Sequence, residues 1–279
     1  MTHVSFTAVL VLLAMLTTTT AVAAERAFLF ATFKGEASPM TEQVYFATSR
    51  DGRQWTALNG GEPVLVSDLG EKGVRDPFLI RSKDGRKTYI IATDLSMARD
   101  GDWTRAVRAS SKSIVIWEST DLVNWSDARL VKVAPDDAGC TWAPEAIYDE
   151  AHDDYLVFWA STTAGDDFAK HRIWASRTKD FQTFSEAFIY IDRPQQVIDT
   201  HIVRDGGRYY RTSKDEKNKT MIYEVADQLM GPWQDVPGNT LAAVRGHEGP
   251  QSFLLEPAAD GKPATWCMLL DYHSRGAGY

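Results

Sequence analysis

The sequence predicts an all-β fold, a five-bladed β-propeller over residues 25–279 whose last blade we expect to be incomplete at the C-terminus. Two short patterns predict it, because they alternate along the chain and recur at blade-like intervals. Each pair of patterns supplies about four short antiparallel strands, which is the content of one blade. An all-β sandwich is the alternative left open by the strand content. Helix-period patterning is too sparse to favour an α/β fold.

The first pattern is a strand of aromatic and β-branched residues, then Ser or Thr, then Asp, then an aromatic residue four positions after the Asp. It occurs at 44–55, 114–125 and 172–184, with a degenerate copy at 221–233. The Asp and aromatic pairs are Asp51 with Trp55, Asp121 with Trp125, and Asp180 with Phe184. We expect each Asp side chain to hold a turn and each aromatic ring to pack beneath it.

The second pattern is a short strand that opens at a carboxylate, followed by a polar turn and a second strand. It occurs at 76–94, 145–161, 199–213 and 248–271. Residues 28–66 add the strands FLFATF, QVYFATS and EPVLVS without a carboxylate-led start. We expect these three strands to form most of the fifth blade. The blade that opens at Glu248 supplies only its first two strands before Tyr279, so we expect the natural chain to be longer.

The composition and the N-terminus narrow the possible partners. The chain has 30 Lys and Arg against 38 Asp and Glu, and its net charge of −8 argues against binding to nucleic acid. The 9 Trp, 10 Tyr and 12 Phe suit either aromatic-rich strands or surfaces that stack on sugars. Residues 1–24 combine an apolar run with a small-x-small pattern, which predicts a signal peptide and a secreted or periplasmic protein. We expect a monomer that has no membrane association once this segment is removed.

Four carboxylates open successive blades, namely Asp76, Glu145, Asp199 and Glu248. The first strand of each blade lines the central channel, so residues at the same register converge at one mouth. Neighbouring carboxylates repel one another, which raises the pKa of some and leaves others ionised. This divergence suits a general acid working with a general base, and it also suits a cation site.

The sequences around these carboxylates resemble glycoside hydrolase family 43, a family of five-bladed propellers. The four matching motifs are the DP strand at 76–77, the WAP strand at 142–145, the ID strand at 198–199 and the EGP strand at 248–250. Each motif alone is weak, whereas the ordered set is specific, and the resemblance spans 28–279. The family usually has Asp where this chain has Glu145.

The resemblance implies three catalytic roles. Asp76 would be the general base, Glu248 the general acid, and Asp199 the residue that orients the acid and tunes its pKa. These roles imply an inverting hydrolysis, in which Glu248 protonates the leaving oxygen and Asp76 activates a water on the opposite face of the sugar. Such a pair lies roughly 6.5–9.5 Å apart.

Five further residues are candidates for substrate binding: Trp142, Glu145, His201, Arg75 and His247. Trp142 either stacks on a sugar or packs between blades, and His201 is either a site residue or a structural histidine. Arg75 and His247 flank catalytic candidates, and strand alternation points them to the opposite face unless a bulge intervenes. The charged run at 214–216 either reaches the mouth or is a solvated surface.

The sequence assigns no metal and no cofactor. The resemblance allows a structural calcium ion, but no ligand set can be aligned to one. Cys140 and Cys267 either pair or serve as small buried apolar groups.

The resemblance implies a glycosidase that acts on a carbohydrate partner, releasing arabinofuranose or xylose from plant-type polysaccharide or oligosaccharide. The alternatives are a propeller glycosidase for galactan, agaro-oligosaccharide or fructan, and a propeller that binds carbohydrate without catalysis. The three catalytic candidates are all present in the chain, which favours an enzyme over a binding protein.

Overall fold

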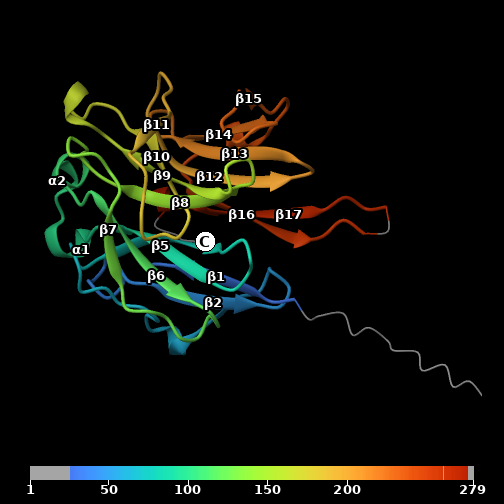
Figure 1. The fold of residues 1–279 in the computed structure, drawn as a ribbon, viewed down its shortest axis with the longest axis horizontal. Coiled ribbons are helices and arrows are strands. Elements are labelled where there is room, and N and C mark those ends of the chain that lie inside the picture. Colours follow the sequence, from blue (N-terminus) through green and yellow to red (C-terminus); the bar gives the residue numbers. More distant parts are fainter. Residues whose placement is uncertain (1–25, 260, 276–279) are drawn as a thin grey trace, which may run out of the picture.

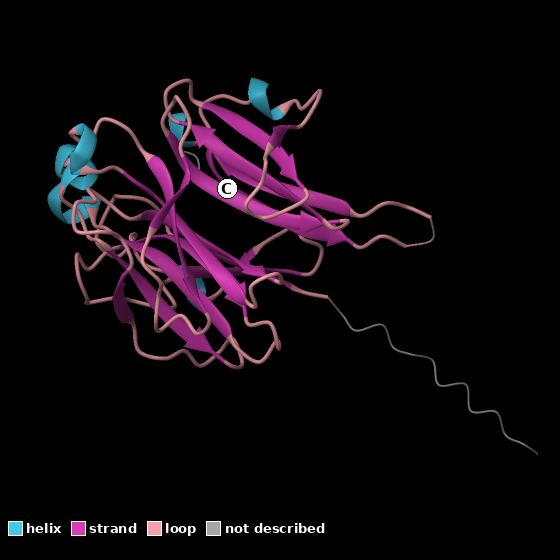
Figure 2. Ribbon diagram, turned by 45° about the horizontal axis from the view of Figure 1, so that its top comes forward, coloured by secondary structure: helices cyan, strands magenta, loops and turns pink. Residues whose placement is uncertain are grey.

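A computed structural model describes residues 26–259 and 261–275. The predicted signal peptide of residues 1–24 lies outside this described part. The described chain is built mainly of strands (Figure 2). None of the helices in this part is long and apolar enough to cross a membrane.

Three of the sheets have the four antiparallel strands of a propeller blade. The first consists of β4 (Val74–Arg81), β5 (Thr88–Asp94), β6 (Ser113–Ser119) and β7 (Arg129–Lys132). The second consists of β8 (Trp142–Asp149), β9 (Asp154–Ser161), β10 (Arg172–Thr178) and β11 (Phe188–Ile191). The third consists of β12 (Val197–Asp205), β13 (Arg208–Asp215), β14 (Thr220–Ala226) and β15 (Gln234–Asp235).

Two smaller sheets complete the described part. One consists of β1 (Phe28–Thr32), β2 (Tyr45–Ser49) and β3 (Thr56–Ala57), and the other of β16 (Glu248–Glu256) and β17 (Thr265–Asp271). The predicted strand EPVLVS forms only an isolated bridge between Val44 and Leu65. The all-β propeller fold is confirmed, while the number of five blades, with the last one incomplete, remains a prediction.

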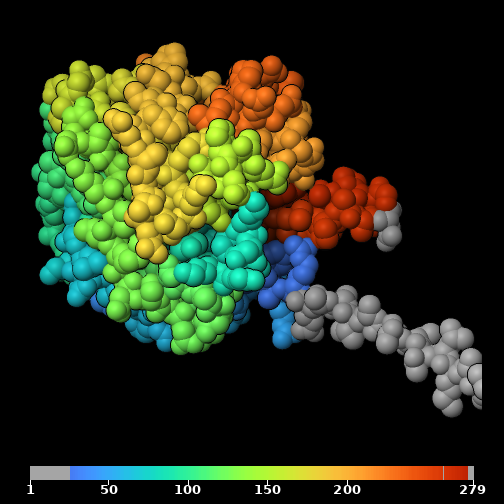
Figure 3. Space-filling model, in the orientation of Figure 1, coloured from blue at the N-terminus to red at the C-terminus, as the bar shows by residue number. Residues whose placement is uncertain are grey.

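The first strands of neighbouring sheets contact one another around the centre of the molecule: β1 contacts β4, β4 contacts β8, β8 contacts β12, and β12 contacts β16. The two small sheets lie side by side, with β1 and β2 in blue next to β16 and β17 in red (Figures 1 and 3). Arg26 donates hydrogen bonds to the carbonyls of Leu254 and Leu255 at 2.8 and 3.1 Å, which joins the N-terminal sheet to the C-terminal sheet.

The predicted Asp turns are confirmed. One carboxylate oxygen of Asp51 accepts from the backbone N–H groups of Arg53 and Gln54, both at 2.8 Å. Asp121 and Asp180 accept from the equivalent pairs of N–H groups at 2.7–3.0 Å. In all three turns the residue after the Asp is left-handed: Gly52, Leu122 and Phe181 have φ values of 70°, 65° and 56°.

The hydrophobic core lies between adjacent sheets. The largest cluster joins the β4–β7 sheet to the β8–β11 sheet and includes Ile91, Ile116 and Trp159, which are almost fully buried. Phe181 reaches into this cluster from its Asp turn and stacks on Tyr89, with ring centroids 4.4 Å apart. The predicted alternative of paired cysteines is excluded, because Cys140 and Cys267 are both free thiols.

Two short helices, α1 (Met97–Asp100) and α2 (Trp103–Arg108), interrupt the connection between β5 and β6. The Asp102 side chain caps α2 by accepting from the N–H groups of Thr104 and Arg105 at 2.8 and 3.1 Å. The Arg105 guanidinium then binds both carboxylate oxygens of Glu71 at 2.8 and 2.9 Å. These contacts hold the helices at one side of the molecule (Figures 1 and 2).

We expect Phe181→Ala to lower the free energy of unfolding by about 3 kcal/mol or more, because it removes a fully buried ring from between two sheets. Leu122→Ala is the matched control, since Leu122 holds the same left-handed turn position with 39% of its surface exposed. That variant should stay within about 0.5 kcal/mol of the parent protein. Chemical unfolding followed by tryptophan fluorescence measures both values, and similar losses in the two variants would contradict the packing role of Phe181.

Candidate active site

A cavity of about 510 Å³ opens at one end of the inner strands. Asp76 of β4, Asp199 of β12 and Glu248 of β16 all line it. The structure therefore brings together the three carboxylates that the sequence predicted to be catalytic. Arg75 and Trp142 also line the cavity, as expected for residues near a substrate.

A repeated β-bulge places these side chains. The register of β4, β8, β12 and β16 against the next strand of each sheet shifts near the start of the strand. One residue in each bulge is left-handed: Asp76, Ala143, Asp199 and Gly249 have φ values of 49°, 45°, 48° and 57°. An extra residue of this kind bends a strand and re-aims its side chains. Regular strand alternation would point Arg75 away from the cavity, and the bulge turns its side chain towards the cavity instead.

The register of the inner strands differs from the one expected from the sequence, in which the four carboxylates occupied equivalent positions. Asp76 and Asp199 occupy equivalent positions, but the equivalent residues in β8 and β16 are Ala143 and Gly249. Glu248 therefore lies one position before the left-handed residue, and Glu145 lies two positions after it. Pro77, Pro144 and Pro250 each follow the left-handed residue, so aligning these prolines would have shown the true register.

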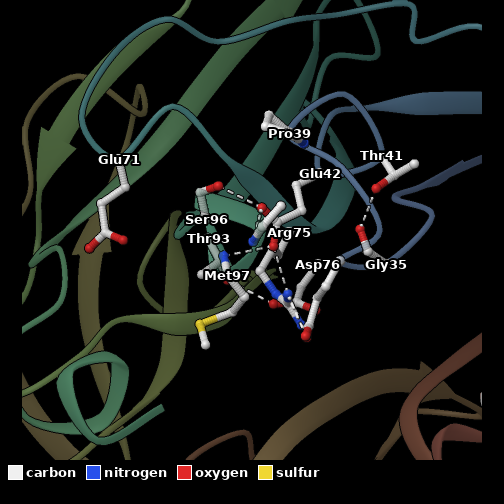
Figure 4. Close-up of polar contacts among 12 residues, drawn as sticks. Gly35, Pro39, Thr41, Glu42, Glu71, Arg75, Asp76, Thr93, Ser96 and Met97 are labelled. Atoms are coloured by element: carbon white, nitrogen blue, oxygen red, sulfur yellow. Dashed lines mark hydrogen bonds and ion pairs between the residues drawn. The ribbon is translucent and has the colours of Figure 1, made fainter. Parts of the chain in front are cut away.

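Asp76 is buried beside two groups that bind its carboxylate. Its Oδ2 accepts from Thr93 Oγ1 at 2.9 Å, and Thr93 Oγ1 in turn accepts from the N–H of Ala143 at 2.8 Å (Figure 4). Burial raises the pKa of Asp76, the charge of Arg75 and the Thr93 hydrogen bond lower it, and Glu248 raises it further. The net increase moves this carboxyl towards the pH range in which a general base works well.

Asp199 joins its own strand to the strand that carries Glu248. Its Oδ2 accepts from the N–H of Gly249 at 3.2 Å. Burial raises the pKa of Asp199 well above its ordinary value, and the nearby charge of Glu248 adds to the increase. Two carboxyls that interact in this way hold a proton to higher pH than either would alone.

Glu248 faces a lysine and a histidine as well as carboxylates. Its Oε2 contacts the Lys214 ammonium group and lies 3.6 Å from His273 Nδ1. Asp271 lies directly opposite Glu248 in the β16–β17 ladder and also lines the cavity. Burial, with the charges of Glu248 and Asp76, raises the pKa of Asp271 to about 6.

Arg75 is held rigidly at the cavity wall. Its NH1 donates to Glu42 at 2.9 Å and to Glu36 at 3.0 Å. Glu42 is fully buried and also accepts from Ser96 Oγ at 2.6 Å and from the Met97 N–H at 2.8 Å (Figure 4). The guanidinium lies over the Phe33 ring at 4.8 Å and the Trp103 ring at 5.6 Å. This network fixes the direction in which Arg75 presents its donors.

Aromatic rings line much of the remaining wall. Trp142 meets Trp103 edge-on at 6.1 Å and lies over His171 at 5.0 Å. Trp103 belongs to α2 and leaves 47% of its surface exposed. His171 is buried, which lowers its pKa and favours the neutral ring, and its Nδ1 lies 3.0 Å from Gln196 Oε1. Flat apolar faces with a few fixed polar groups suit the binding of a sugar ring.

Glu145 and His201 do not line this cavity: Glu145 lines a smaller one together with Asp76 and Asp199, and His201 lines a separate hollow. His201 Nδ1 lies 2.8 Å from Glu145 Oε2, while His201 Nε2 accepts from the Ser252 N–H at 2.9 Å. The ring is therefore the neutral Nδ1–H tautomer and donates to Glu145. Gln251 donates to the other oxygen of Glu145. Glu145, His201 and Gln251 occupy equivalent positions of β8, β12 and β16, each two residues after the left-handed residue of its strand. Because His201 and Gln251 both hydrogen-bond to Glu145, the three side chains form one layer across the centre of the molecule.

His247 does not line the cavity either, and its contact with substrate stays a prediction. Its ring stacks on Tyr272 with centroids 4.0 Å apart, and its Nδ1 donates to the Arg245 carbonyl at 2.8 Å. Its stacking partner follows β17, so His247 supports the C-terminal hairpin.

Sequence reasoning missed two site residues that come from second strands, Thr93 and Asp271, and left open whether a third, Lys214, reaches the mouth. Thr93, Lys214 and Asp271 lie opposite Arg75, Ile198 and Glu248 in their hairpins. Each therefore flanks the bulge of its own blade. These residues could have been found by counting back along each hairpin from its turn, because that count gives the residue that pairs with each position of the inner strand.

No group of three or more His, Cys, Asp or Glu side chains within residues 26–259 and 261–275 is arranged to hold a metal ion. The side chains at the site are mainly clustered carboxylates, one lysine and aromatic rings.

Known proteins share this architecture. A family model described as a probable glycosyl hydrolase domain, related to glycosyl hydrolase family 43, matches residues 24–279. An α-L-arabinofuranosidase of Bifidobacterium longum subsp. longum is 33% identical over 177 residues. That match covers 57% of this chain but only 16% of the longer relative.

Solved structures show the same fold at low identity. An endo-1,4-β-xylanase of Bacteroides thetaiotaomicron superposes with a TM-score of 0.59 at 16% identity, covering 88% of this chain and 80% of that one. An exo-β-1,3-galactanase of Phanerochaete chrysosporium superposes with a TM-score of 0.56 at 14% identity, covering 90% of this chain and 59% of that one. With a family model that matches nearly the whole chain and a propeller fold shared with these enzymes, this chain belongs to glycoside hydrolase family 43.

Proposed function

We propose that this chain is a glycosidase that releases arabinofuranose or xylose from plant-type polysaccharide or oligosaccharide by inverting acid/base hydrolysis. The observation that carries the proposal is the meeting of Asp76, Asp199 and Glu248 in one cavity. The arabinofuranosidase relative supports arabinofuranose as the first sugar to test. The protein would act as an exported monomer, with residues 1–24 as its signal peptide.

Glu248 is the proposed acid and Asp76 the proposed base. Glu248 gives a proton to the leaving glycosidic oxygen, while Asp76 takes a proton from a water that attacks the opposite face of the sugar. Asp199 fixes the backbone next to Glu248 through the Gly249 N–H and couples electrostatically to it. The raised pKa of Asp199 keeps a proton within this carboxyl cluster.

Substrate recognition would rest on the wall residues. Arg75 offers donors whose direction is fixed by Glu42 and Glu36, and such fixed groups bind sugar hydroxyls with little loss of side-chain entropy. Trp103 and Trp142 offer ring surfaces at the wall of the cavity. Substrate contact by Glu145, His201 and His247 stays a prediction, since these residues lie outside the lining of the main cavity and hydrogen-bond to other protein atoms.

We expect Asp76→Asn to lower kcat/KM on arabinan or xylan oligosaccharides by about 1,000-fold, because the amide cannot take a proton from water. Glu248→Gln should cause a similar loss on these substrates. Its loss should be much smaller on nitrophenyl glycosides, whose leaving group needs little protonation. Initial rates over a panel of arabino-, xylo- and galacto-oligosaccharides measure these effects and identify the sugar.

Asp94→Asn is the matched control for these carboxyl-to-amide changes. Asp94 is buried next to Thr93 and burial raises its pKa to about 6, but it does not line the cavity. This variant should keep kcat/KM within a few-fold of the parent. Full activity in both site variants would remove the assignment, and a parent protein that binds oligosaccharides without cleaving them would indicate a non-catalytic carbohydrate-binding propeller.

The first product should have the anomeric configuration opposite to that of the substrate, because an acid and a base on opposite faces give a single displacement. Proton NMR during the first minutes of hydrolysis, before the free sugar equilibrates, distinguishes the two anomers. A first product with retained configuration would contradict the assignment of Asp76 as a base and would indicate a covalent intermediate, as in fructosidase-like propellers.

A further inference from the structure

Lys214 is an unusual residue for the place it occupies. It lies near the end of β13 with only 2% of its surface exposed, whereas lysine is rarely buried without a partner. It pairs with Ile198 in the β12–β13 ladder, which places it beside the bulge that carries Asp199. The sequence offered only a charged run here, to which no function was assigned.

The ammonium group of Lys214 joins two carboxylates of the site. It contacts Glu248 Oε2 and lies 2.8 Å from Glu216 Oε2, and both glutamates line the cavity. Glu216 is also bound by Lys219. Lys214 therefore connects the third blade to the strand that carries the proposed acid.

The other charged groups around Glu248 are mostly acidic. Asp76, Asp199 and Asp271 interact with it electrostatically from β4, β12 and β17. His273 lies 3.6 Å from the same oxygen that Lys214 contacts, but burial lowers the pKa of His273 and favours its neutral ring, while His247 acts on the neighbouring Asp271. Without Lys214, Glu248 would face three carboxyls and one partly exposed histidine.

We propose that Lys214 is a positioning residue for Glu248: its ammonium group fixes the carboxylate at the cavity and stabilises its charged form, and so sets the upper pH limit of the acid step. The catalytic part of this inference rests on the proposed function. The sign follows from simple electrostatics, because a nearby cation favours the ionised form of an acid.

The equivalent residue of another blade supports this role. Thr93 holds the same hairpin position as Lys214, and it also connects its own blade to the next one through Asp76 and the Ala143 N–H. In both blades this second-strand residue reaches across to a neighbouring inner strand. In the third blade the side chain carries a charge, so it affects protonation as well as position.

The test compares Lys214→Met, Lys214→Arg and Glu216→Gln with the parent protein. The upper limb of the pH profile of kcat/KM should move up by about 1 pH unit or more in Lys214→Met, because the ionised acid loses its cation. It should stay near the parent value in Lys214→Arg, which keeps the charge. The upper limb should move to lower pH in Glu216→Gln. This change removes the carboxylate that competes with Glu248 for Lys214, so the ammonium group then interacts with Glu248 alone.

A second measurement does not depend on turnover. Carbon NMR of carboxyl-labelled glutamate, with the Glu248 signal assigned by its loss in Glu248→Gln, should show the same shifts in the titration of Glu248. If the parent cleaves no glycoside but these shifts occur, the proposed function fails and the role of Lys214 in fixing the charge of Glu248 stands.

An unchanged Glu248 titration in Lys214→Met would overturn the inference, and so would a fall in kcat with no movement of the upper limb. Circular dichroism and thermal unfolding establish that each variant is folded. If Lys214→Met does not fold, Glu216→Gln decides, because an unchanged or upward shift in that variant contradicts the proposed role.

Discussion

The candidate site depends on one backbone constraint, a left-handed residue inside the bulge that opens four inner strands. Left-handed backbone is uncommon outside glycine, and Asp tolerates it better than most residues. At two of these positions the residue is Asp, and its carboxylate enters the cavity. At the other two it is Ala143 or Gly249, whose N–H group hydrogen-bonds to a side chain of the preceding blade. The left-handed position therefore carries a carboxylic acid in β4 and β12, and a backbone N–H donor in β8 and β16.

The sequence was informative where structure is local. Each Asp turn depends on a few consecutive residues, so the turns at Asp51, Asp121 and Asp180 could be predicted together with the strands around them. Gathering of the three carboxylates also followed from the blade repeat. The register of Glu145 could not be predicted, because similarity of side chains does not reveal strand register: Glu145 lies two positions after the left-handed residue of its strand, whereas Asp76 and Asp199 are that residue. Asp271 was missed, and the position of Lys214 was left open, because both depend on pairing across hairpins with loops of different length.

The inner strands form two layers with different electrostatics. In the cavity, Asp76, Asp199, Glu248 and Asp271 crowd together, and the pKa values of Asp76, Asp199 and Asp271 rise. Behind it, a neutral His201 ring and Gln251 satisfy the single carboxylate of Glu145. Beyond this layer the surroundings become apolar, with Phe28, Phe78 and Trp266 around a separate hollow. The clustered carboxylates with raised pKa values thus lie at the main cavity, where a substrate can enter.

The contact between Arg26 and the strand at Leu254 and Leu255 has a consequence for how the molecule assembles. These residues are more than two hundred positions apart, and closing so long a loop costs entropy before any contact compensates for it. The same C-terminal hairpin carries Glu248 and Asp271. During synthesis, the blades before it can fold while half of the acidic cluster is still absent. The polypeptide therefore gains its complete set of cavity carboxylates only when this C-terminal hairpin packs against β12, and the contact with Arg26 adds the other end of the described chain to the same hairpin.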